Sequence, residues 1–300
     1  MELSNISELQ AFLDYLKFEK RYARHTISSY ASDLAFFYEF IGAQYELDRA
    51  ADIQASMIRG WLASMKEQGH SAKSINRRIS AVKSFYRFLQ RKGIVTNTPT
   101  AMLVAPKVSK RLPVYVEVKD LETLFRHVEF PDDRTGRLER LIFALFYATG
   151  MRLSELTGLK ETQVDLSKQQ LKILGKGNKE RIIPMTSELK KLMEEYIAEK
   201  KSVSADVHVE NLLVNDKGKS LHPRYVQGVV KRYLSLVTTI EKKSPHVLRH
   251  SFATHLMNNG AELNAVKELL GHSSLAATQI YTHNTIDKLK EIHARAHPKS

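Results

Sequence analysis

Four separated segments of this chain carry side chains that bind phosphate or move protons. In chain order they are 148–152, 175–179, 246–250 and 268–283. The side chains of interest are two arginines, a lysine, two histidines and a tyrosine, namely Arg152, Lys176, His246, Arg249, His272 and Tyr281. Arginines hold phosphate oxygens with their planar forks, histidine and lysine transfer protons, and a tyrosine hydroxyl attacks phosphorus. The set therefore predicts cleavage of a phosphodiester by a tyrosine nucleophile without a metal ion.

Two of these residues also have ordinary structural explanations. Arg152 follows a predicted helix end at Gly150, where it could simply pair with Glu155 at the surface. Lys176 lies between two glycines at the tip of a predicted hairpin, where a solvated lysine is common. The functional interpretation makes this lysine a finger that carries an ammonium group to the substrate. Neither residue alone decides between the two interpretations.

A second pair stands at the start of a predicted helix. Ser244 is placed to cap this helix, and the proline after it suits the first helical position. His246 and Arg249 are three residues apart, so they share a face near a helix N-terminus, which attracts anions. A capping histidine with a surface arginine is the structural alternative. Tyr281 follows His272, a turn residue, by nine positions and ends a further short predicted helix.

The composition favours a polyanionic partner. The 300 residues include 46 Lys and Arg against 33 Asp and Glu, a formal net charge of +13. Residues 1–110 carry 16 basic and 10 acidic residues, and the remainder is also basic, so the excess is not a tail. Such a distribution indicates nucleic acid before a membrane surface.

The cysteine count and the N-terminal sequence limit the possible chemistry and cellular location of the protein. There is no cysteine, which excludes disulfides, Cys-ligated zinc and thiol nucleophiles. The first residues lack the basic start and apolar stretch of a signal peptide, and no apolar run approaches the ~18 residues of a membrane span. We therefore expect a cytoplasmic, nucleoid-associated protein without a membrane partner and without a small-molecule substrate.

Proline marks a boundary between two domains of ordinary size. The stretch 97–113 contains three prolines and predicts an extended linker, because proline interrupts helices and sheet ladders. We therefore expect a helical domain at 1–96 and a second domain at 114–300. Helical apolar spacing predicts four helices in the first domain, over 5–20, 26–42, 54–68 and 71–92.

The helix predicted over 71–92 has the most informative pattern. One face is apolar and consists of Ile75, Ile79, Val82, Phe85, Tyr86 and Leu89. The opposite arc carries four basic residues, Lys73, Arg77, Arg87 and Arg91, with Asn76, Ser80 and Ser84 among them. Basic residues interleaved with small polar donors suit a helix laid along a DNA groove. The alternative is a solvated outer face, which is the usual place of charged helix residues.

The second domain is predicted to be mostly helical with a small antiparallel sheet. Strands over 170–174 and 180–184 flank a glycine-rich turn and form a hairpin. A short helix begins near Ser154, and longer helices are predicted over 118–128, 134–149, 187–200, 222–238, 246–258, 262–270 and 274–280. Beyond Tyr281, the segment 285–296 has an apolar stripe that either packs on its own domain or docks on another subunit.

The four segments resemble the motifs of the tyrosine recombinase/integrase family, and most closely those of bacterial Xer (XerC/XerD-type) site-specific recombinases. The resembling stretches are 145–156, 175–184, 245–256 and 270–283, and every catalytic position of the family is filled. Residues 1–96 are similar to the family's helical, SAM-like core-binding domain. The resemblance implies a mainly α-helical protein whose two domains form a C-shaped clamp around duplex DNA.

The resemblance also implies how the phosphodiester is broken. Tyr281 attacks the scissile phosphate, becomes a 3′-phosphotyrosine and releases a 5′-hydroxyl. Arg152 and Arg249 bind the non-bridging oxygens, with His272 assisting. Rejoining reverses these steps on a new strand.

Two further residues move protons in the mechanism that the resemblance implies. His246 accepts the proton of the tyrosine, and Lys176 donates one to the departing 5′ oxygen. A phenol with its ordinary pKa of ~10 needs such a base or a strong positive potential. No metal, cofactor or ATP is expected, because the phosphotyrosine conserves the energy of the broken bond.

The family acts as a homo- or hetero-tetramer on two DNA sites, and its Xer members carry out chromosome dimer resolution and similar recombination. The resemblance leaves open whether a second recombinase or a DNA translocase of the FtsK type is required. Three alternative functions remain: a short integrase of a mobile element, a type IB topoisomerase, and a non-catalytic DNA-binding regulator. A topoisomerase shares the chemistry but works as a monomer without site preference.

Overall fold

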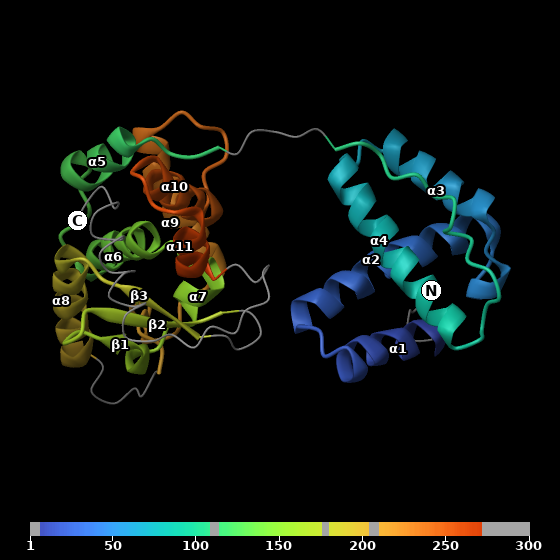
Figure 1. Cartoon of the computed structure of the whole chain (residues 1–300), viewed down its shortest axis with the longest axis horizontal. Helices are drawn as coiled ribbons and strands as arrows, with labels where there is room; N and C mark the ends of the chain where they lie inside the picture. Colours follow the sequence, from blue (N-terminus) through green and yellow to red (C-terminus); the bar gives the residue numbers. More distant parts are fainter. Residues whose placement is uncertain (1–6, 109–113, 176–179, 204–209, 272–300) are drawn as a thin grey trace. The chain divides into compact units, whose positions relative to one another are not determined.

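The computed structural model describes residues 7–108, 114–175, 180–203 and 210–271. The chain divides into two compact units, Met1–Arg111 and Leu112–Ser300 (Figure 1). The catalytic candidates Lys176, His272 and Tyr281 lie outside the described residues. Among the helices of the described ranges, none has the length and apolarity needed to cross a bilayer.

The first unit is all helical, as predicted. Its helices are α1 (Ser7–Asp14), α2 (Arg24–Tyr45), α3 (Ala55–Glu67) and α4 (Ala72–Arg91). The sequence predicted one helix over 5–20, but α1 passes into a π-helical turn at Tyr15–Glu19. Two consecutive residues of this turn, Tyr15 and Leu16, are buried in the core. Helix α2 packs against α1, α3 and α4, and aromatic rings fill the space between them.

Helix α4 has the amphipathic pattern that its sequence predicts. Its six apolar residues are at most 5% exposed, and they are Ile75, Ile79, Val82, Phe85, Tyr86 and Leu89. Ser71 caps the helix by accepting a hydrogen bond from the backbone N–H of Ser74 at 3.2 Å. The four basic residues of the opposite arc are exposed. The helix therefore presents four basic side chains to solvent.

Part of the proline-rich segment packs on this unit. Thr100 and Leu103 are 3% and 7% exposed. The side-chain amide of Asn76 donates to the carbonyl of Pro106 at 2.9 Å, and the Lys83 ammonium donates to the carbonyl of Leu103 at 3.2 Å. The chain therefore stays on α4 as far as Pro106, because two α4 side chains bond its backbone.

The second unit surrounds a buried helix with other helices and a small sheet (Figure 1). Its helices are α5 (Val118–His127), α6 (Arg134–Thr149), α7 (Leu153–Thr157), α8 (Ser187–Val203), α9 (Pro223–Val237), α10 (Pro245–Asn258) and α11 (Leu263–Leu270). Every residue from Leu141 to Met151 is buried, because α6 is covered by α7, α8, α9 and α10. This core holds the chain segments that carry the candidate arginines.

The sheet is antiparallel and has the order β1-β2-β3. Strands β2 (Gln170–Leu174) and β3 (Glu180–Pro184) form the predicted hairpin, and the short strand β1 (Val164–Asp165) was not predicted. In the register of β2 and β3, Leu171 pairs with Ile183 and Ile173 pairs with Arg181. All four of these residues are buried, so an arginine occupies a position of the apolar face.

Two glycines end helices at points of close packing. Gly150 ends α6 in the left-handed region at φ +58°, and a Cβ there would stand 2.4 Å from the ring of Phe252. Gly271 ends α11 at φ +64°, and a Cβ there would stand 3.1 Å from Cδ of Arg181. Only glycine accepts both the backbone angle and the contact without strain. Gly271 thus lies against the side chain of Arg181, and the carbonyl of Gly150 accepts a hydrogen bond from Arg249.

Candidate active site

Arg152 is held by one carboxylate through two atoms. It is the N-cap of α7, and its backbone N–H donates to Oε2 of Glu155 at 2.7 Å while its guanidinium donates to Oε1 at 2.7 Å. The pairing anticipated from the sequence is present, but the Glu155 side chain is only 4% exposed, so this is no surface pair. The Arg152 side chain itself is 30% exposed, and its Nη2 donates to the carbonyl of Gly271 at 3.3 Å.

Arg249 is buried rather than exposed. This residue of α10 is 7% exposed, so the surface arginine considered from the sequence is wrong. Its Nη1 donates to the carbonyl of Gly150 at 2.6 Å, and its Nη2 donates to that of Leu270 at 2.7 Å. Burial, and next the positive charge of Arg152, lower the pKa of Arg249 to about 10. A guanidinium kept in such surroundings attracts an anion.

A third arginine, which the sequence did not single out, completes the cluster. Arg181 of β3 donates from Nη1 and Nη2 to the two oxygens of Glu155 at 3.0 and 2.7 Å. Its Nε donates to the carbonyl of Leu269 at 2.9 Å. The available signal was strand alternation, which places Arg181 on the same face as Ile183 and therefore inward. A charged residue at an inward position of a strand indicates a buried partner.

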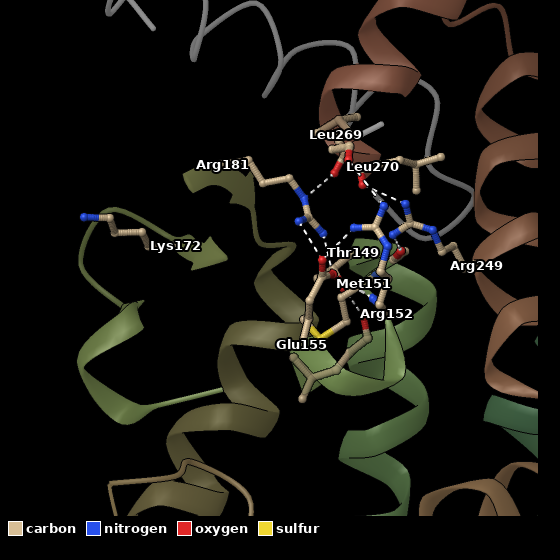
Figure 2. Close-up of polar contacts among 12 residues, drawn as sticks. Thr149, Met151, Arg152, Glu155, Lys172, Arg181, Arg249, Leu269 and Leu270 are labelled. Atoms are coloured by element: carbon tan, nitrogen blue, oxygen red, sulfur yellow. Dashed lines mark hydrogen bonds and ion pairs between the residues drawn. The ribbon is translucent and has the colours of Figure 1, made fainter. Parts of the chain in front are cut away.

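The C-terminal end of α11 unites the three arginines (Figure 2). Three successive carbonyls, of Leu269, Leu270 and Gly271, accept hydrogen bonds from Arg181, Arg249 and Arg152 respectively. The last carbonyls of a helix lack partners within the helix and carry partial negative charge, so cations satisfy them. The next residue along the chain is His272. The arginines are thus fixed to the chain segment that leads into another candidate residue.

The charge of this cluster is positive. Among the described residues, the cluster contains three guanidinium groups and one carboxylate, and Glu155 pairs with two of the three, Arg152 and Arg181. Burial opposes the ionisation of Glu155, but hydrogen bonds from Arg181 and from Arg152, together with the charge of Arg181, lower its pKa to about 2. Glu155 is therefore ionised at neutral pH, and the net charge of the cluster is about +2. A phosphodiester, which carries one negative charge, would lower this net charge to about +1.

The helix that carries Arg249 confirms most, but not all, of its predicted features. Pro245 is its first residue, as predicted, and Leu248 is buried in the core. Ser244 is the N-cap, but its side chain makes no capping bond, and its Oγ is buried without a partner among the described residues. The predicted serine cap is therefore wrong. His246 is exposed in the first turn, while Arg249, three residues later, is buried.

The basic face of α4 belongs to the first unit and is anchored from within that unit. Arg77 is 52% exposed and donates to Asp33 at 2.5 Å, and Nε of Arg78 lies 3.7 Å from the other oxygen of Asp33. Burial is the main cause that raises the pKa of Asp33, and the two arginines oppose it. Arg87 and Arg91 are exposed and each bonds a carbonyl one turn earlier. Lys73 is also exposed, and DNA contact by this face remains a prediction.

Comparison with known proteins decides the family. The model of the phage integrase family matches residues 115–288, and that of the phage integrase N-terminal SAM-like domain matches residues 9–93. This chain belongs to the phage integrase family. Its members in this comparison are tyrosine recombinases, and the chain is one of these enzymes.

Several relatives match over their whole length. The tyrosine recombinases XerC and XerD of Halalkalibacterium halodurans are each 37% identical, and each alignment covers 100% of both chains. The XerC of Chlorobaculum parvum is 34% identical over 99% of this chain and 96% of its own. This member of the family is thus equally identical to the XerC and the XerD of one organism.

Solved structures share the fold. A crystal structure of the XerH site-specific recombinase bound to a palindromic difH substrate, in a post-cleavage complex, is 25% identical with a TM-score of 0.72. The match covers 96% of this chain and 83% of that one. A lambda integrase fragment bound to a core site has a TM-score of 0.70 at 18% identity, covering 94% of this chain and 99% of that one. The mostly helical fold with a small sheet is therefore the fold of this family.

Proposed function

We propose that this enzyme is a site-specific DNA recombinase of the Xer type, which cleaves and rejoins duplex DNA through a 3′-phosphotyrosine at Tyr281. The observation that carries the proposal is the arrangement of Arg152 and Arg249. Their hydrogen bonds to adjacent carbonyls, of Gly271 and Leu270, bring two guanidinium groups together at one helix end. A guanidinium has five N–H donors, so N–H groups remain on both for the non-bridging oxygens of a phosphate.

The arginines act chiefly in the transition state. Negative charge builds on the phosphoryl oxygens as the tyrosine oxygen attacks, and donors already in place stabilise it without reorganisation. Glu155 and the carbonyls at the end of α11 hold both guanidinium groups before DNA arrives. In this proposal the two arginines supply the charge stabilisation that metal ions supply in many nucleases.

The remaining candidates complete the proposed chemistry. His246, exposed in the first turn of α10, accepts the proton of the Tyr281 hydroxyl. Lys176, which lies between β2 and β3 in the sequence, protonates the departing 5′ oxygen. His272, directly after the helix end that binds the arginines, assists them in binding the phosphate.

The proposed partner is duplex DNA, held as in a C-shaped clamp by both units. The supports are the net charge of +13, the exposed basic residues of α4 and the DNA complexes of similar recombinases. We further propose that a tetramer on two DNA sites carries out chromosome dimer resolution in the cytoplasm, alone or with a second recombinase. A DNA translocase of the FtsK type is a candidate partner.

Covalent trapping tests the proposal. A nicked DNA substrate loses a short 5′ fragment after cleavage, so the enzyme stays attached as an SDS-stable adduct. We expect such an adduct with the wild type, also in EDTA, and no adduct with Tyr281→Phe at unchanged DNA affinity. An adduct with Tyr281→Phe would show that another residue is the nucleophile.

The trapped DNA also separates the neighbouring functions. A recombinase yields adducts at one sequence and forms complexes that hold two sites, whereas a type IB topoisomerase yields adducts at many sequences as a monomer. Absence of any adduct with the wild-type enzyme, at DNA concentrations that saturate binding, would favour a non-catalytic regulator.

A further inference from the structure

The Arg181 side chain is buried, and each of its nitrogens donates a hydrogen bond to another part of the protein. It is 4% exposed, and its three nitrogens donate to both oxygens of Glu155 and to the carbonyl of Leu269. Its Cδ would also lie 3.1 Å from a Cβ at Gly271, so the side chain packs directly under the end of α11. A side chain buried in this way does not reach the substrate. It does bond Glu155, which in turn bonds Arg152, a residue proposed to contact the phosphate.

Arg181 joins three chain segments that each lead to a proposed catalytic residue. It lies on β3, the strand that follows Lys176 in the sequence. It bonds Glu155, which holds the backbone and the guanidinium of Arg152. It also bonds the first of the three carbonyls at the end of α11, two residues before Gly271. A flat fork with five donors in fixed directions can make these bonds together, and an ammonium group cannot.

Arg181 also sets how strongly Glu155 holds Arg152. Oε1 of Glu155 accepts from Nη1 of Arg152 at 2.7 Å and from Nη1 of Arg181 at 3.0 Å. Oε2 accepts from the Arg152 backbone and from Nη2 of Arg181, both at 2.7 Å. One carboxylate paired with Arg152 alone would neutralise it. Because Arg181 shares the carboxylate, positive charge remains at Arg152 for a phosphate.

We propose that Arg181 is a positioning residue for the recombination reaction. It aligns Arg152 through Glu155, restrains the end of α11 and keeps the Arg152 charge available to the scissile phosphate. This inference rests on the proposed function, because it presumes that Arg152 binds the phosphate that Tyr281 attacks.

The test compares three variants of the full-length enzyme. Arg181→Met removes the charge, and Arg181→Lys keeps the charge but loses the fork. Arg137→Met is the matched control, because Arg137 makes a similar two-bond pair with Glu199, at 3.0 and 2.8 Å, between α6 and α8. For each variant the thermal transition, the DNA affinity and the single-turnover rate of adduct formation on nicked DNA are measured.

We expect both Arg181 variants to bind DNA within about threefold of the wild type and to form the adduct more slowly by roughly 10–10²-fold, the cost of a small misplacement of reacting groups. Arg137→Met should keep the wild-type rate. If Arg181→Met does not fold, Arg181→Lys carries the test alone. A wild-type rate for a folded Arg181 variant would overturn the inference.

A neutral phosphate separates positioning from a purely structural role. When a methyl group replaces one non-bridging oxygen, the methylphosphonate needs less positive charge than the ordinary diester. The rate deficit of Arg181→Met and of Arg152→Ala should therefore shrink by at least about tenfold on this substrate, the scale of one donor's electrostatic contribution. An equal deficit of Arg181→Met on both substrates, with recovery of Arg152→Ala, would overturn positioning and leave only a structural role.

The two proposals fail in different ways. If the wild-type enzyme forms no adduct, or if Tyr281→Phe forms one, the proposed function fails and this inference falls with it. If the wild type forms the adduct through Tyr281 and Arg152→Ala is impaired, but Arg181→Met is not, only the inference about Arg181 fails.

Discussion

At the residue scale, the geometry of the site depends on one carboxylate that two arginines share. Glu155 is a single carboxylate between two guanidinium groups, and Arg249 has main-chain carbonyls as partners. A buried ion pair costs much to desolvate, so such a carboxylate stabilises the fold only while both arginines hydrogen-bond it. The cluster therefore links the stability of the second unit to the geometry that the reaction needs.

The first prediction concerns acid stability. The folded-state pKa of Glu155 is about 2, below its ordinary value of 4.5. Ionised Glu155 therefore stabilises the folded state above about pH 5, and this stabilisation is lost as the pH falls toward 2. We expect Glu155→Gln to lower the free energy of unfolding at pH 7 by about 3 kcal/mol, from the size of the shift. The curves of the two proteins against pH should converge near pH 2.

The measurement can separate the two units. The only tryptophan of the chain, Trp61, belongs to the first unit, so its fluorescence follows that unit, while far-UV circular dichroism follows both. Urea unfolding should change in the dichroism transition and not in the fluorescence transition. Glu199→Gln, which breaks an exposed pair with Arg137, is the control and should show little effect. A pH-independent difference for Glu155→Gln would contradict the prediction.

The second prediction concerns the proposed general acid. If Lys176 protonates the 5′ oxygen, Lys176→Ala should slow cleavage of ordinary DNA by ~10²–10⁴-fold, the usual contribution of general acid–base catalysis. A 5′-bridging sulfur leaves as a thiolate and needs no proton, so the variant should recover most of its rate on that substrate. Arg249→Ala should not recover, because its role is electrostatic. If Lys176→Ala lowers the cleavage rate equally on both substrates, the lysine is a phosphate contact and not the general acid.

At the element scale, helix ends position the site. Gly150 is the C-cap of α6, Arg152 is the N-cap of α7, and Gly271 is the C-cap of α11, so three helix termini meet at the arginine cluster. Termini offer unpaired carbonyl and N–H groups, which regular helix interiors do not. The same glycines that stop these helices also allow the close contacts with Phe252 and Arg181. The residues that end these helices are therefore also needed for the geometry of the arginine cluster.

The third prediction tests that requirement. Gly150→Ala should destabilise the second unit by roughly 2–4 kcal/mol, because its φ is left-handed and its Cβ would overlap the Phe252 ring. Gly228→Ala in α9 is the matched control, since nothing lies within 4 Å of its added Cβ. That substitution should stabilise the helix by about 0.5–1 kcal/mol. Urea unfolding followed by circular dichroism measures both, and equal effects of the two substitutions would contradict the prediction.

At the scale of the whole molecule, both units carry the basic excess. Residues 1–110 and the rest of the chain are each net positive, which suits two units that contact one polyanion. The chain is bonded to α4 at Pro106 and to α10 at Val116, whose N–H donates to Oγ of Ser251 at 2.8 Å. The segment between the units is therefore hydrogen-bonded to α4, which carries the proposed DNA contacts, and to α10, which carries proposed catalytic residues.

The fourth prediction concerns the basic face of α4. Binding of DNA should weaken steeply as salt rises, because each phosphate contact releases counterions. Replacing Lys73 or Arg87 by alanine should weaken binding to all DNA sequences and lower the slope of log K against log salt by about 1. Arg137→Ala removes the same charge from the second unit, where Glu199 already pairs it, and should leave the slope unchanged. Equal slopes for all four proteins would place the DNA contacts elsewhere.

The sequence by itself determined the elements whose causes are local. The apolar period of α4, the alternation of β2 and β3 around a glycine-rich turn, and the helix stop at Gly150 follow from side-chain spacing and backbone freedom. The motifs around Arg152 and Arg249 also led to the right family. These features need no knowledge of distant contacts, so the residues alone were enough to predict them.

Only the tertiary structure decided which charges are buried and what they bind. Arg181 lies in an ordinary strand, yet its partners are Glu155 and Leu269, which are 26 and 88 residues away. Arg249 is buried and the segment up to Pro106 packs on α4, each because of neighbours from other elements, and Ser244 makes no capping bond. Desolvation and pairing depend on atoms brought together by the fold, and sequence spacing contains no measure of them.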